Sequence, residues 1–494
     1  MNTMVENIIY KHADEMPDKL AIAAMNGDFT YAELASEVSR AACFLKRSGI
    51  QKGDRILLSA VPEKEYFAFY FGLHLLGGIC VPIAINAKQD LVNHIIESTD
   101  AKFLVGNANT SYENIQILTY DMMYSESDYD GRVEMVAELD DVADIIYTTG
   151  TTGLAKGVAL THRNLVAGAH NIINAVDMQE DDAVLAPLPL NHSNALGTMG
   201  AYMYRGASLI VHDGFTNIKN MEDRMKKYCC TAFSGAPAAL SILDKVTRGH
   251  MESILGNMRY VEIGTAPMDV EFRKKVMQIL PNVKLLINYG ATEARRAVYM
   301  DLNEFPDKVK SIGRPVKDMS VKIIDDNDVP IESSADNIGR LVICGATCMQ
   351  GYWNEPELSK EVLVAGGLAT SDLAYVDEDG FIFLVGRAND VINIGGKKVS
   401  PFEIEDALLT NEKVAECACI PVNDPSGILG NVPVMYVVLK PEVSLEKDEM
   451  KHYLLGRLET YKVPVDFVVI EELPRNYVGK LDRKKLKTMW EDGC

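Results

Sequence analysis

The sequence has fewer basic than acidic residues, and this shortage bears on its partners. Lys and Arg together number 49, against 70 for Asp and Glu, which gives a formal net charge of −21 at pH 7. A surface that binds nucleic acid needs an excess of Lys and Arg to meet the phosphate backbone. The composition therefore argues against nucleic acid as a partner, and we interpret the acidity as favouring solubility.

Cysteines with metal-binding spacing are also lacking. The nine cysteines are scattered, and neither Cys229–Cys230 nor the pair Cys417 and Cys419 has the spacing or the second pair of a zinc site. The first 20 residues contain acidic side chains and no apolar core, which is not the pattern of a secretory signal. An odd number of cysteines without such a signal predicts reduced thiols and a cytoplasmic location.

No uninterrupted hydrophobic run has the length of a membrane span. Residues 66–85 come nearest to the roughly 17–25 residues that a bilayer requires. His74, Gly77–Gly78 and Pro82 interrupt this stretch. The pattern predicts a helix over 63–76, a Gly-Gly stop and a short buried strand over 79–83, and no membrane span.

Strand-like and helical patterns alternate through most of the 494 residues. Apolar runs such as 55–60 and 260–263 alternate with amphipathic stretches such as 31–47 and 270–280. This alternation predicts an α/β architecture with largely parallel sheets. The sequence contains no internal repeat and no low-complexity segment.

The pattern changes after about residue 300. Short strands separated by Gly, Asp and Asn turns predict a β-rich subdomain, and a compact polar joint follows at 386–390. The last ~105 residues have an α+β pattern of their own, which is enough for a small domain. We therefore expect a large N-terminal domain of stacked, mostly parallel sheets with helices and a β-rich subdomain over 1–386, and a small mobile α+β C-terminal domain over 387–494.

A loop rich in Gly and Thr follows the apolar strand predicted at 144–147. The run Tyr147–Val158 contains three glycines, four threonines and Lys156. Glycines let backbone N–H groups turn toward an anion, hydroxyls donate further bonds, and the lysine adds charge. The P-loop pattern does not fit, because Lys156 lies between Ala155 and Gly157. By itself the run predicts either a polyphosphate cradle or a structural hairpin.

Together with five later segments, this loop resembles the signature of the adenylate-forming superfamily, which comprises acyl- and aryl-CoA synthetases, amino-acid-adenylating domains and luciferases. The family's loop reads Tyr-Thr-Ser-Gly-Thr-Thr-Gly-x-Pro-Lys-Gly-Val. Here Thr149 replaces the Ser and Ala155 the Pro, which removes a fixed φ but no ligand group. The later segments follow in the family's order: 187–192, 264–267, 288–293, 370–372 with Gly386–Arg387, and 474–483.

The resemblance implies ATP as a substrate. The loop would hold the β- and γ-phosphates, Tyr289 would stack on adenine, Asp372 would accept from both ribose hydroxyls, and Arg387 would reach the ribose side. The residues implied in ATP binding are Thr148, Thr149, Gly150, Thr151, Thr152, Gly153, Lys156, Gly264, Thr265, Ala266, Pro267, Asn288, Tyr289, Gly290, Ala291, Asp372 and Arg387.

The resemblance also implies a catalytic set. Thr292 would touch the α-phosphate, and Glu293, together with Thr151, would hold Mg²⁺, because a hard carboxylate oxygen suits a cation that bridges phosphates. Lys480 would bridge the substrate carboxylate and the α-phosphate. His192 would lie beside that carboxylate. The predicted catalytic residues are thus Lys480, Thr292, Glu293 and His192.

Three positions near the predicted domain boundary also follow from the resemblance. Asn389 stands at the family's hinge, where Asp or Lys is usual, and Asn suits a hinge because it tolerates unusual φ and ψ. Gly396 would line the tunnel of the thiol acceptor. Ser371 replaces the Gly of the family's Thr-Gly-Asp, and a positive φ there would strain it.

The implied reaction activates a carboxylic acid as an acyl-adenylate, with release of pyrophosphate, and then transfers the acyl group to coenzyme A. The family's amino-acid-activating domains usually carry an Asp near residue 192, and this sequence has none there. The alternatives are a ligase that loads the phosphopantetheine arm of an acyl carrier protein, a luciferase-type oxidation and a non-catalytic binding module of the same fold.

The resemblance places a substrate pocket at His192, Arg295 and Arg296. Two adjacent arginines would bind a second acidic or strongly polar group on the acid. The competing interpretation is that one or both arginines pair with structural acids of this acidic protein. The sequence leaves open the identity of the acid, the choice between coenzyme A and a carrier protein, and whether the chain forms a homodimer.

Overall fold

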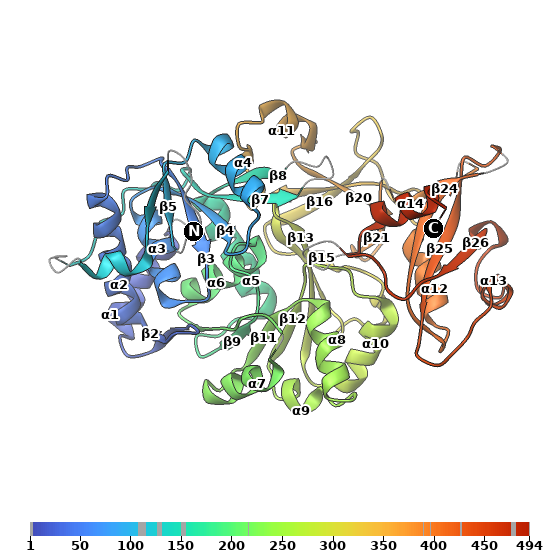
Figure 1. Cartoon of the computed structure of the whole chain (residues 1–494), viewed down its shortest axis with the longest axis horizontal. Helices are drawn as coiled ribbons and strands as arrows, with labels where there is room; N and C mark the ends of the chain where they lie inside the picture. The colour runs from blue at the N-terminus through green and yellow to red at the C-terminus, as the bar shows by residue number, and fades with distance from the viewer. Residues whose placement is uncertain are drawn as a thin grey trace.

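Figure 1 shows the computed structural model of the chain, which describes residues 3–106, 115–125, 131–149, 155–215, 217–388, 390–395, 397–424, 427–475 and 481–493, without the side chain of Thr149. Two large sheets, a smaller antiparallel sheet and a C-terminal group of strands and helices make up this part of the chain. The predicted fold class, mixed α/β with a β-rich region and a C-terminal domain, is confirmed.

A nine-stranded sheet runs in the order β15-β14-β13-β12-β11-β9-β10-β1-β2. Every pairing from β13 to β1 is parallel, whereas β14, β15 and β2 are antiparallel additions at the two edges. The strands are β1 (Leu20–Ala23), β2 (Asp28–Thr30), β9 (Ala183–Ala186), β10 (Ser208–Val211), β11 (Ala232–Gly235), β12 (Tyr260–Ile263), β13 (Lys284–Ala291), β14 (Arg295–Asp301) and β15 (Arg314–Pro315).

A seven-stranded sheet runs in the order β18-β8-β7-β4-β3-β5-β6. Its pairings from β7 to β6 are parallel, and β8 and β18 are antiparallel. The strands are β3 (Arg55–Ala60), β4 (Ile79–Ala84), β5 (Phe103–Val105), β6 (Gln116–Leu118), β7 (Val142–Thr149), β8 (Ala155–Thr161) and β18 (Gly351–Tyr352). Both sheets therefore match the predicted stacked, mostly parallel architecture.

One hydrophobic core joins residues of both large sheets and the helices between them. Local signals explain where these helices begin: Thr30 and Thr161 each form a capping box at the start of α2 and α5. The helices of this part are α1 (Val5–Glu15), α2 (Tyr31–Arg47), α3 (Lys64–Leu75), α4 (Gln89–Thr99), α5 (His162–Val176), α6 (Ser193–Arg205), α7 (Ile218–Lys227), α8 (Pro237–Val246), α9 (Glu252–Leu255) and α10 (Val270–Ile279), with short 3-10 turns at Tyr120–Ser125 and Pro306–Lys308.

The predicted β-rich subdomain is an antiparallel five-stranded sheet with the short helix α11 (Pro356–Val362) beside it. The path β16-β17-β20-β19 is extended by β21, which pairs with β20. The strands are β16 (Met319–Ile324), β17 (Gly339–Gly345), β19 (Leu363–Val364), β20 (Gly367–Val376) and β21 (Ile382–Arg387).

The C-terminal elements lie together at one end of the molecule, orange to red in Figure 1. Two hydrophobic clusters within them consist of residues from 392 onward, so this part has cores of its own. The elements are β22 (Ile392–Ile394), β23 (Lys397–Val399), α12 (Pro401–Leu409), β24 (Val414–Asn423), β25 (Asn431–Leu439), α13 (Lys447–Leu455), a 3-10 turn at Thr460–Lys462, β26 (Asp466–Val469) and α14 (Arg483–Glu491).

Two sequence expectations can be compared directly with these elements. The hydrophobic stretch near residue 66 is helix α3 followed by a turn with Gly77 at a φ of +70° and by strand β4, as predicted; no helix in the described ranges could cross a membrane. The basic segment after residue 482, in contrast, shows no helical pattern that we predicted from the sequence, and it is helix α14. The side chain of Asp482 accepts from the Lys485 N–H at its start, and Leu486 is buried against β24 and β25.

Candidate active site

The parallel strands β11, β12 and β13 end at one edge of the large sheet, where open α/β folds bind their ligands. Gly264 follows β12 and lies against Asn288 of β13. A Cβ at 264 would lie 2.2 Å from Asn288 Oδ1, so only glycine fits there. Thr265 has a φ of +73°, which leads the chain away from the strand. The predicted adenine-side loop therefore lies beside the predicted adenine-stacking segment.

The two ends of the glycine-rich run lie on the antiparallel strands β7 and β8. Thr148 pairs with Lys156, and Thr149 pairs with Ala155, across antiparallel strands. Gly150, Thr151, Thr152 and Gly153 lie outside the described residues. Strands β7 and β8, which flank the loop, are thus paired as in a hairpin. Whether the loop also binds phosphate depends on the surroundings of Lys156.

Lys156 is connected to Glu293 through Tyr352, a residue that sequence reasoning missed. The Lys156 Nζ lies 5.5 Å from the centre of the Tyr352 ring, and the Tyr352 hydroxyl donates to Glu293 Oε1 at 2.9 Å. Burial, followed by the charge of Glu293, raises the pKa of Tyr352, so this hydroxyl keeps its proton. Strand β18 pairs with β8 and brings Tyr352 to this place. An isolated Gly-Tyr pair in the sequence carries no signal of such a position.

A second contact joins the predicted base and ribose residues. The Tyr289 hydroxyl donates to Asp372 Oδ2 at 2.5 Å. Asp372 of β20 is opposite Arg387 of β21, with 3.8 Å between Oδ1 and Nε. Burial, and then the Asp372 charge, raises the pKa of Tyr289. Ser371 is not among the residues with a positive φ, so the strain considered for this replacement does not arise.

The start of α6 meets the turn between β13 and β14. His192 occupies the N-cap position of α6, and Thr292 lies in the turn. The hydroxyls of Ser193 and Thr292 are 3.2 Å apart and share a hydrogen bond. The structure therefore brings the segments of His192 and Thr292 together, although they are about a hundred residues apart in the sequence.

The two consecutive arginines have different surroundings. Arg296 lies 3.3 Å from Glu262, between Nη1 and Oε1, and its Nη2 donates to Asn194 Oδ1 at 2.5 Å and to Thr198 Oγ1 at 2.8 Å. The guanidinium of Arg295 instead lies against Gly168 of α5 and Gly197 of α6. Arg296 thus has a structural acid as its partner, while Arg295 forms no ion pair in the described part of the chain.

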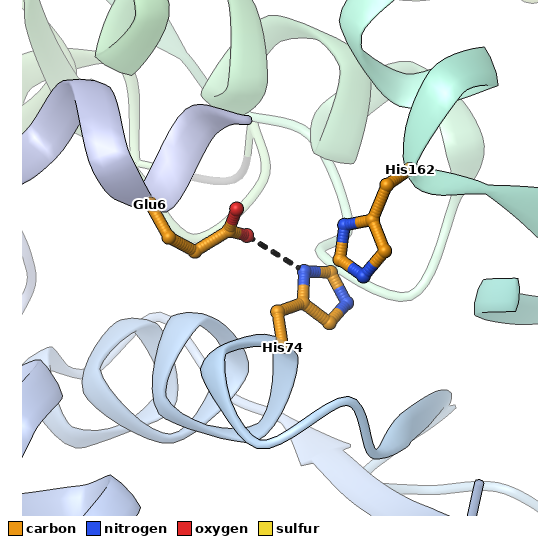
Figure 2. A group of neighbouring side chains, drawn as sticks. All are labelled: Glu6, His74 and His162. Carbon is orange, nitrogen blue, oxygen red and sulfur yellow. Dashed lines mark hydrogen bonds and ion pairs between the residues drawn. The ribbon is translucent and has the colours of Figure 1, made fainter. Parts of the chain in front are cut away.

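A cluster of buried charged side chains includes Asp144 of strand β7. Figure 2 shows Glu6, His74 and His162, whose ligand atoms lie within 4.8 Å of one another, close enough for a metal site. However, His74 Nδ1 is 3.0 Å from Glu6 and its Nε2 is 3.1 Å from Asp144, which also accepts from the Tyr70 hydroxyl. A ring with a carboxylate at each nitrogen is held as an imidazolium.

The protonation of the two histidines follows from their neighbours. Burial by itself would lower the pKa of His74, but its hydrogen bonds to Asp144 and Glu6 outweigh burial and raise it to about 9. Burial, together with the His74 charge, lowers the pKa of His162 to about 4. The cluster thus holds one buried cation between two carboxylates, and it ties α1 and α3 to the strand that leads into the glycine-rich loop.

Three predicted residues of the C-terminal region, Asn389, Gly396 and Lys480, lie outside the described residues. The residues that flank the segment of Lys480 are anchored: the Asp482 N–H donates to Pro474 O at 2.8 Å. Arg483 forms a 2.8 Å ion pair with the buried Glu405 of α12. Burial raises the pKa of Glu405 to about 7, against the attraction of Arg483.

Two family models match the chain. The model described as "AMP-binding enzyme" covers residues 9–353, and that described as "AMP-binding enzyme C-terminal domain" covers residues 403–480. A 4-coumarate–CoA ligase of Oryza sativa subsp. japonica is 30% identical over 93% of this chain and 87% of its own length.

Solved structures with the same fold cover nearly the whole chain. ATP-bound MatB from Rhodopseudomonas palustris has a TM-score of 0.90 at 25% identity, covering 100% of this chain and 99% of that one. O-succinylbenzoate coenzyme A synthetase from Bacillus subtilis, in complex with ATP and a magnesium ion, has a TM-score of 0.84 at 26% identity, covering 97% and 99%.

Proposed function

This chain belongs to the family of AMP-binding enzymes, and from that membership we propose which of its residues carry out its reaction. The chain is an AMP-forming acid–thiol ligase. It activates a carboxylic acid with ATP as an acyl-adenylate, releases pyrophosphate, and transfers the acyl group to coenzyme A with release of AMP.

The chemistry explains what the site must provide. A carboxylate is a poor acyl donor because its leaving group would be oxide. When a substrate carboxylate oxygen attacks the α-phosphorus of ATP, pyrophosphate leaves and a mixed anhydride forms. The protein therefore has to position two anions in line and neutralise charge as it develops.

The contact of Lys156 with Glu293 through Tyr352 carries the assignment of the phosphate site. It joins a cation on the glycine-rich hairpin to a carboxylate at the edge where three parallel strands end. A structural hairpin does not require a lysine beside such a carboxylate. We assign Lys156 and the loop 148–153 to the β- and γ-phosphates of ATP.

Glu293 is the residue that would hold Mg²⁺, with Thr151 as the second predicted ligand. The fit rests on donor chemistry: Oε1 accepts from Tyr352, which orients a hard carboxylate of the kind that Mg²⁺ prefers. Magnesium bound there would offset the charge of the polyphosphate. The described residues contribute the orientation of this carboxylate, through the Tyr352 hydroxyl.

The adenosine side is assigned to Tyr289, Asp372 and Arg387. Their mutual contacts support one continuous site, because the Tyr289 hydroxyl is fixed by the carboxylate that would accept from the ribose. The backbone of 264–267 and of Asn288–Ala291 would lie along the base, since Gly264 packs directly on Asn288. Tyr289 would then present its ring face to adenine.

The reacting centre is assigned to Thr292, His192 and Lys480. The contact of Ser193 with Thr292 supports this, because it holds the segments proposed for the substrate carboxylate and the α-phosphate together. Lys480 would bridge the two anions from the C-terminal domain. We place that domain at 387–494, with Asn389 as hinge and Gly396 on the thiol tunnel; the separate cores after residue 392 support the boundary.

Carboxylate-dependent exchange of labelled pyrophosphate into ATP tests the proposal. We expect exchange with at least one acid of a broad panel, and acid-dependent AMP release that coenzyme A accelerates. Glu293→Gln should abolish exchange, while Glu304→Gln, on the exposed turn after β14, should leave it unchanged. No exchange with any acid would support a binding module instead, and transfer only to a phosphopantetheinylated carrier protein would replace coenzyme A as the acceptor.

A further inference from the structure

The polar side chains of Asn194 and Arg296 lie close, in the sequence, to the residues of the proposed reacting centre and contact each other. Asn194 follows Ser193, whose hydroxyl contacts Thr292, and Arg296 lies four positions after Thr292. Arg296 reaches back to Asn194 through both the backbone oxygen, at 3.2 Å, and the side-chain Oδ1, at 2.5 Å. If the carboxylate of the bound acid lies at Thr292 as proposed, Asn194 is placed next to the part of the acid that follows the carboxylate.

Arg296 pairs with one buried carboxylate, Glu262, which is itself held by residues of several strands. Glu262 of β12 pairs with it and also accepts from Tyr299 at 2.7 Å, from Asn288 at 3.0 Å and, through Oε2, from Ser234 at 3.1 Å. The side chains of Arg296 and Glu262 are only 6% and 2% exposed. A buried charge with this many partners keeps one position.

This arrangement fixes the orientation of the Asn194 amide. A guanidinium only donates hydrogen bonds, so the atom that faces Arg296 must be the amide oxygen. The amide NH₂ of Asn194 then points away from Arg296. Asn194 is half-buried, and its Nδ2 has no hydrogen-bond partner within the described ranges. The residue that follows Ser193 thus carries an amide of fixed orientation whose two N–H groups can donate to a ligand.

Arg295 places a second guanidinium in the core between α5 and α6. Its guanidinium fills the space between α5 and α6: a Cβ at Gly168 would lie 2.5 Å from Nε, and one at Gly197 would lie 3.1 Å from Nη2. Arg295 is 6% exposed, and its Nη1 is buried without a hydrogen bond to any described residue. Apolar methylenes against two buried guanidinium groups would gain little from burial.

We infer that the acid activated by this chain is short and carries an acceptor oxygen close to its reacting carboxylate, and that Asn194 recognises this oxygen. Hydroxy, oxo and dicarboxylic acids have the required chemistry. Asn194 is the specificity-determining residue, and the Glu262–Arg296 pair acts through it as a positioning pair. The inference rests on the proposed function, because that function places the acid's carboxylate at His192 and Thr292.

Pyrophosphate exchange with matched acids provides the first test. We expect kcat/KM for 3-hydroxybutanoate, 3-oxobutanoate or succinate to exceed that for butanoate at least tenfold, and dodecanoate to be inactive. A preference for butanoate or dodecanoate would overturn the inference while leaving the proposed function intact. Absence of exchange with every acid would count against the proposed function itself.

Variants distinguish recognition of the polar acid by Asn194 from a general effect of the substitutions on protein packing. Asn194→Leu should raise KM for the polar acid at least tenfold, leave KM for ATP unchanged and not weaken the use of butanoate. The double variant Glu262→Gln with Arg296→Met should change selectivity in the same direction, as should the milder Arg296→Lys. The matched control is the double variant Asp182→Asn with Arg259→Met. It removes a different ion pair, of 2.7 Å, at the amino ends of β9 and β12. Unchanged selectivity in Asn194→Leu would refute the assignment.

Discussion

At the scale of single residues, Tyr352 links two motifs that are far apart in the sequence. Its ring lies against the ammonium group of Lys156, and its hydroxyl donates to Glu293. One side chain therefore positions the cation proposed for the polyphosphate and the carboxylate proposed for the metal. We treat Tyr352 as a positioning residue, because it acts through Lys156 and Glu293.

Removing the Tyr352 hydroxyl should weaken magnesium-dependent activity. A hydrogen bond to a charged group contributes about 1.5–3 kcal/mol, which corresponds to a loss of roughly ten- to a hundredfold in kcat/KM. In Tyr352→Phe we expect that loss in pyrophosphate exchange, and half-maximal activity at a higher Mg²⁺ concentration. Tyr375→Phe is the control, since that ring stacks on Phe383, 5.0 Å away. An unchanged Mg²⁺ dependence would show that the hydroxyl does not orient Glu293.

At the scale of elements, the Glu6–His74–Asp144 cluster ties together α1, α3 and β7. Each element contributes one charge, and β7 continues into the glycine-rich loop three residues after Asp144. Breaking such a buried group by removing one partner is more damaging than replacing all of it, since a charge would be left unpaired. We therefore expect the stability of this junction between α1, α3 and β7 to depend on the protonation of His74.

The stability of the protein should fall as pH rises through the pKa of His74. That pKa is about 9 in the folded chain, against about 6.5 in an unfolded one. The folded state binds the extra proton between these values, so the stabilisation is complete below pH 6.5 and disappears by pH 9 and above. This proton contributes at most about 3 kcal/mol to the free energy of unfolding. Denaturant unfolding at pH 7.5 and pH 9.5 measures the loss.

A variant of the same cluster isolates the contribution of His74. In Glu6→Gln the imidazolium loses one of its two carboxylates, so the loss of stability between pH 7.5 and pH 9.5 should be smaller than in the wild-type chain. His250→Gln should behave like the wild type, because His250 is exposed and its partner Glu252 lies two residues away. Equal losses in Glu6→Gln and the wild type would contradict the proposed role of the cluster.

At the scale of the whole molecule, the proposed site takes residues from two parts with separate cores. The residues proposed for the phosphates, the base and the substrate carboxylate belong to the part before residue 387, and Lys480, the proposed bridging residue, belongs to the part after it. The ion pair of Arg483 with Glu405 anchors the chain just after Lys480 to the C-terminal part. Movement of that part would therefore carry Lys480 toward or away from the reacting anions.

Loss of Lys480 should affect one half-reaction far more than the other. Removing one preorganised electrostatic group costs roughly 10²–10³ in kcat, and we expect this loss for acyl-adenylate formation in Lys480→Ala. Thioester formation from presynthesised acyl-adenylate should change little, because the bond to pyrophosphate is already broken. Lys485→Ala, exposed on α14, is the control. A normal rate of adenylate formation would refute the role of Lys480.

The sequence alone determined the features that depend on neighbours along the chain. The bounds of α2 and of the strands at 55–60 and 260–263 follow from local patterns, since a capping box and a short apolar run can be recognised without a distant partner. The family and its reaction followed from motifs that are each continuous and occur in one order.

Only the tertiary structure decided contacts between residues that are distant in sequence. Tyr352 meets Glu293 across 59 residues, His74 meets Asp144 across 70, and Arg296 meets Asn194 across 102. In the sequence, Arg295 and Arg296 were equivalent; in the fold, one pairs with Glu262 and orients Asn194, while the other fills a gap between two helices. The physical reason is that the partner of a buried charge is chosen by packing, which brings together strands and helices whose sequences carry no mark of each other.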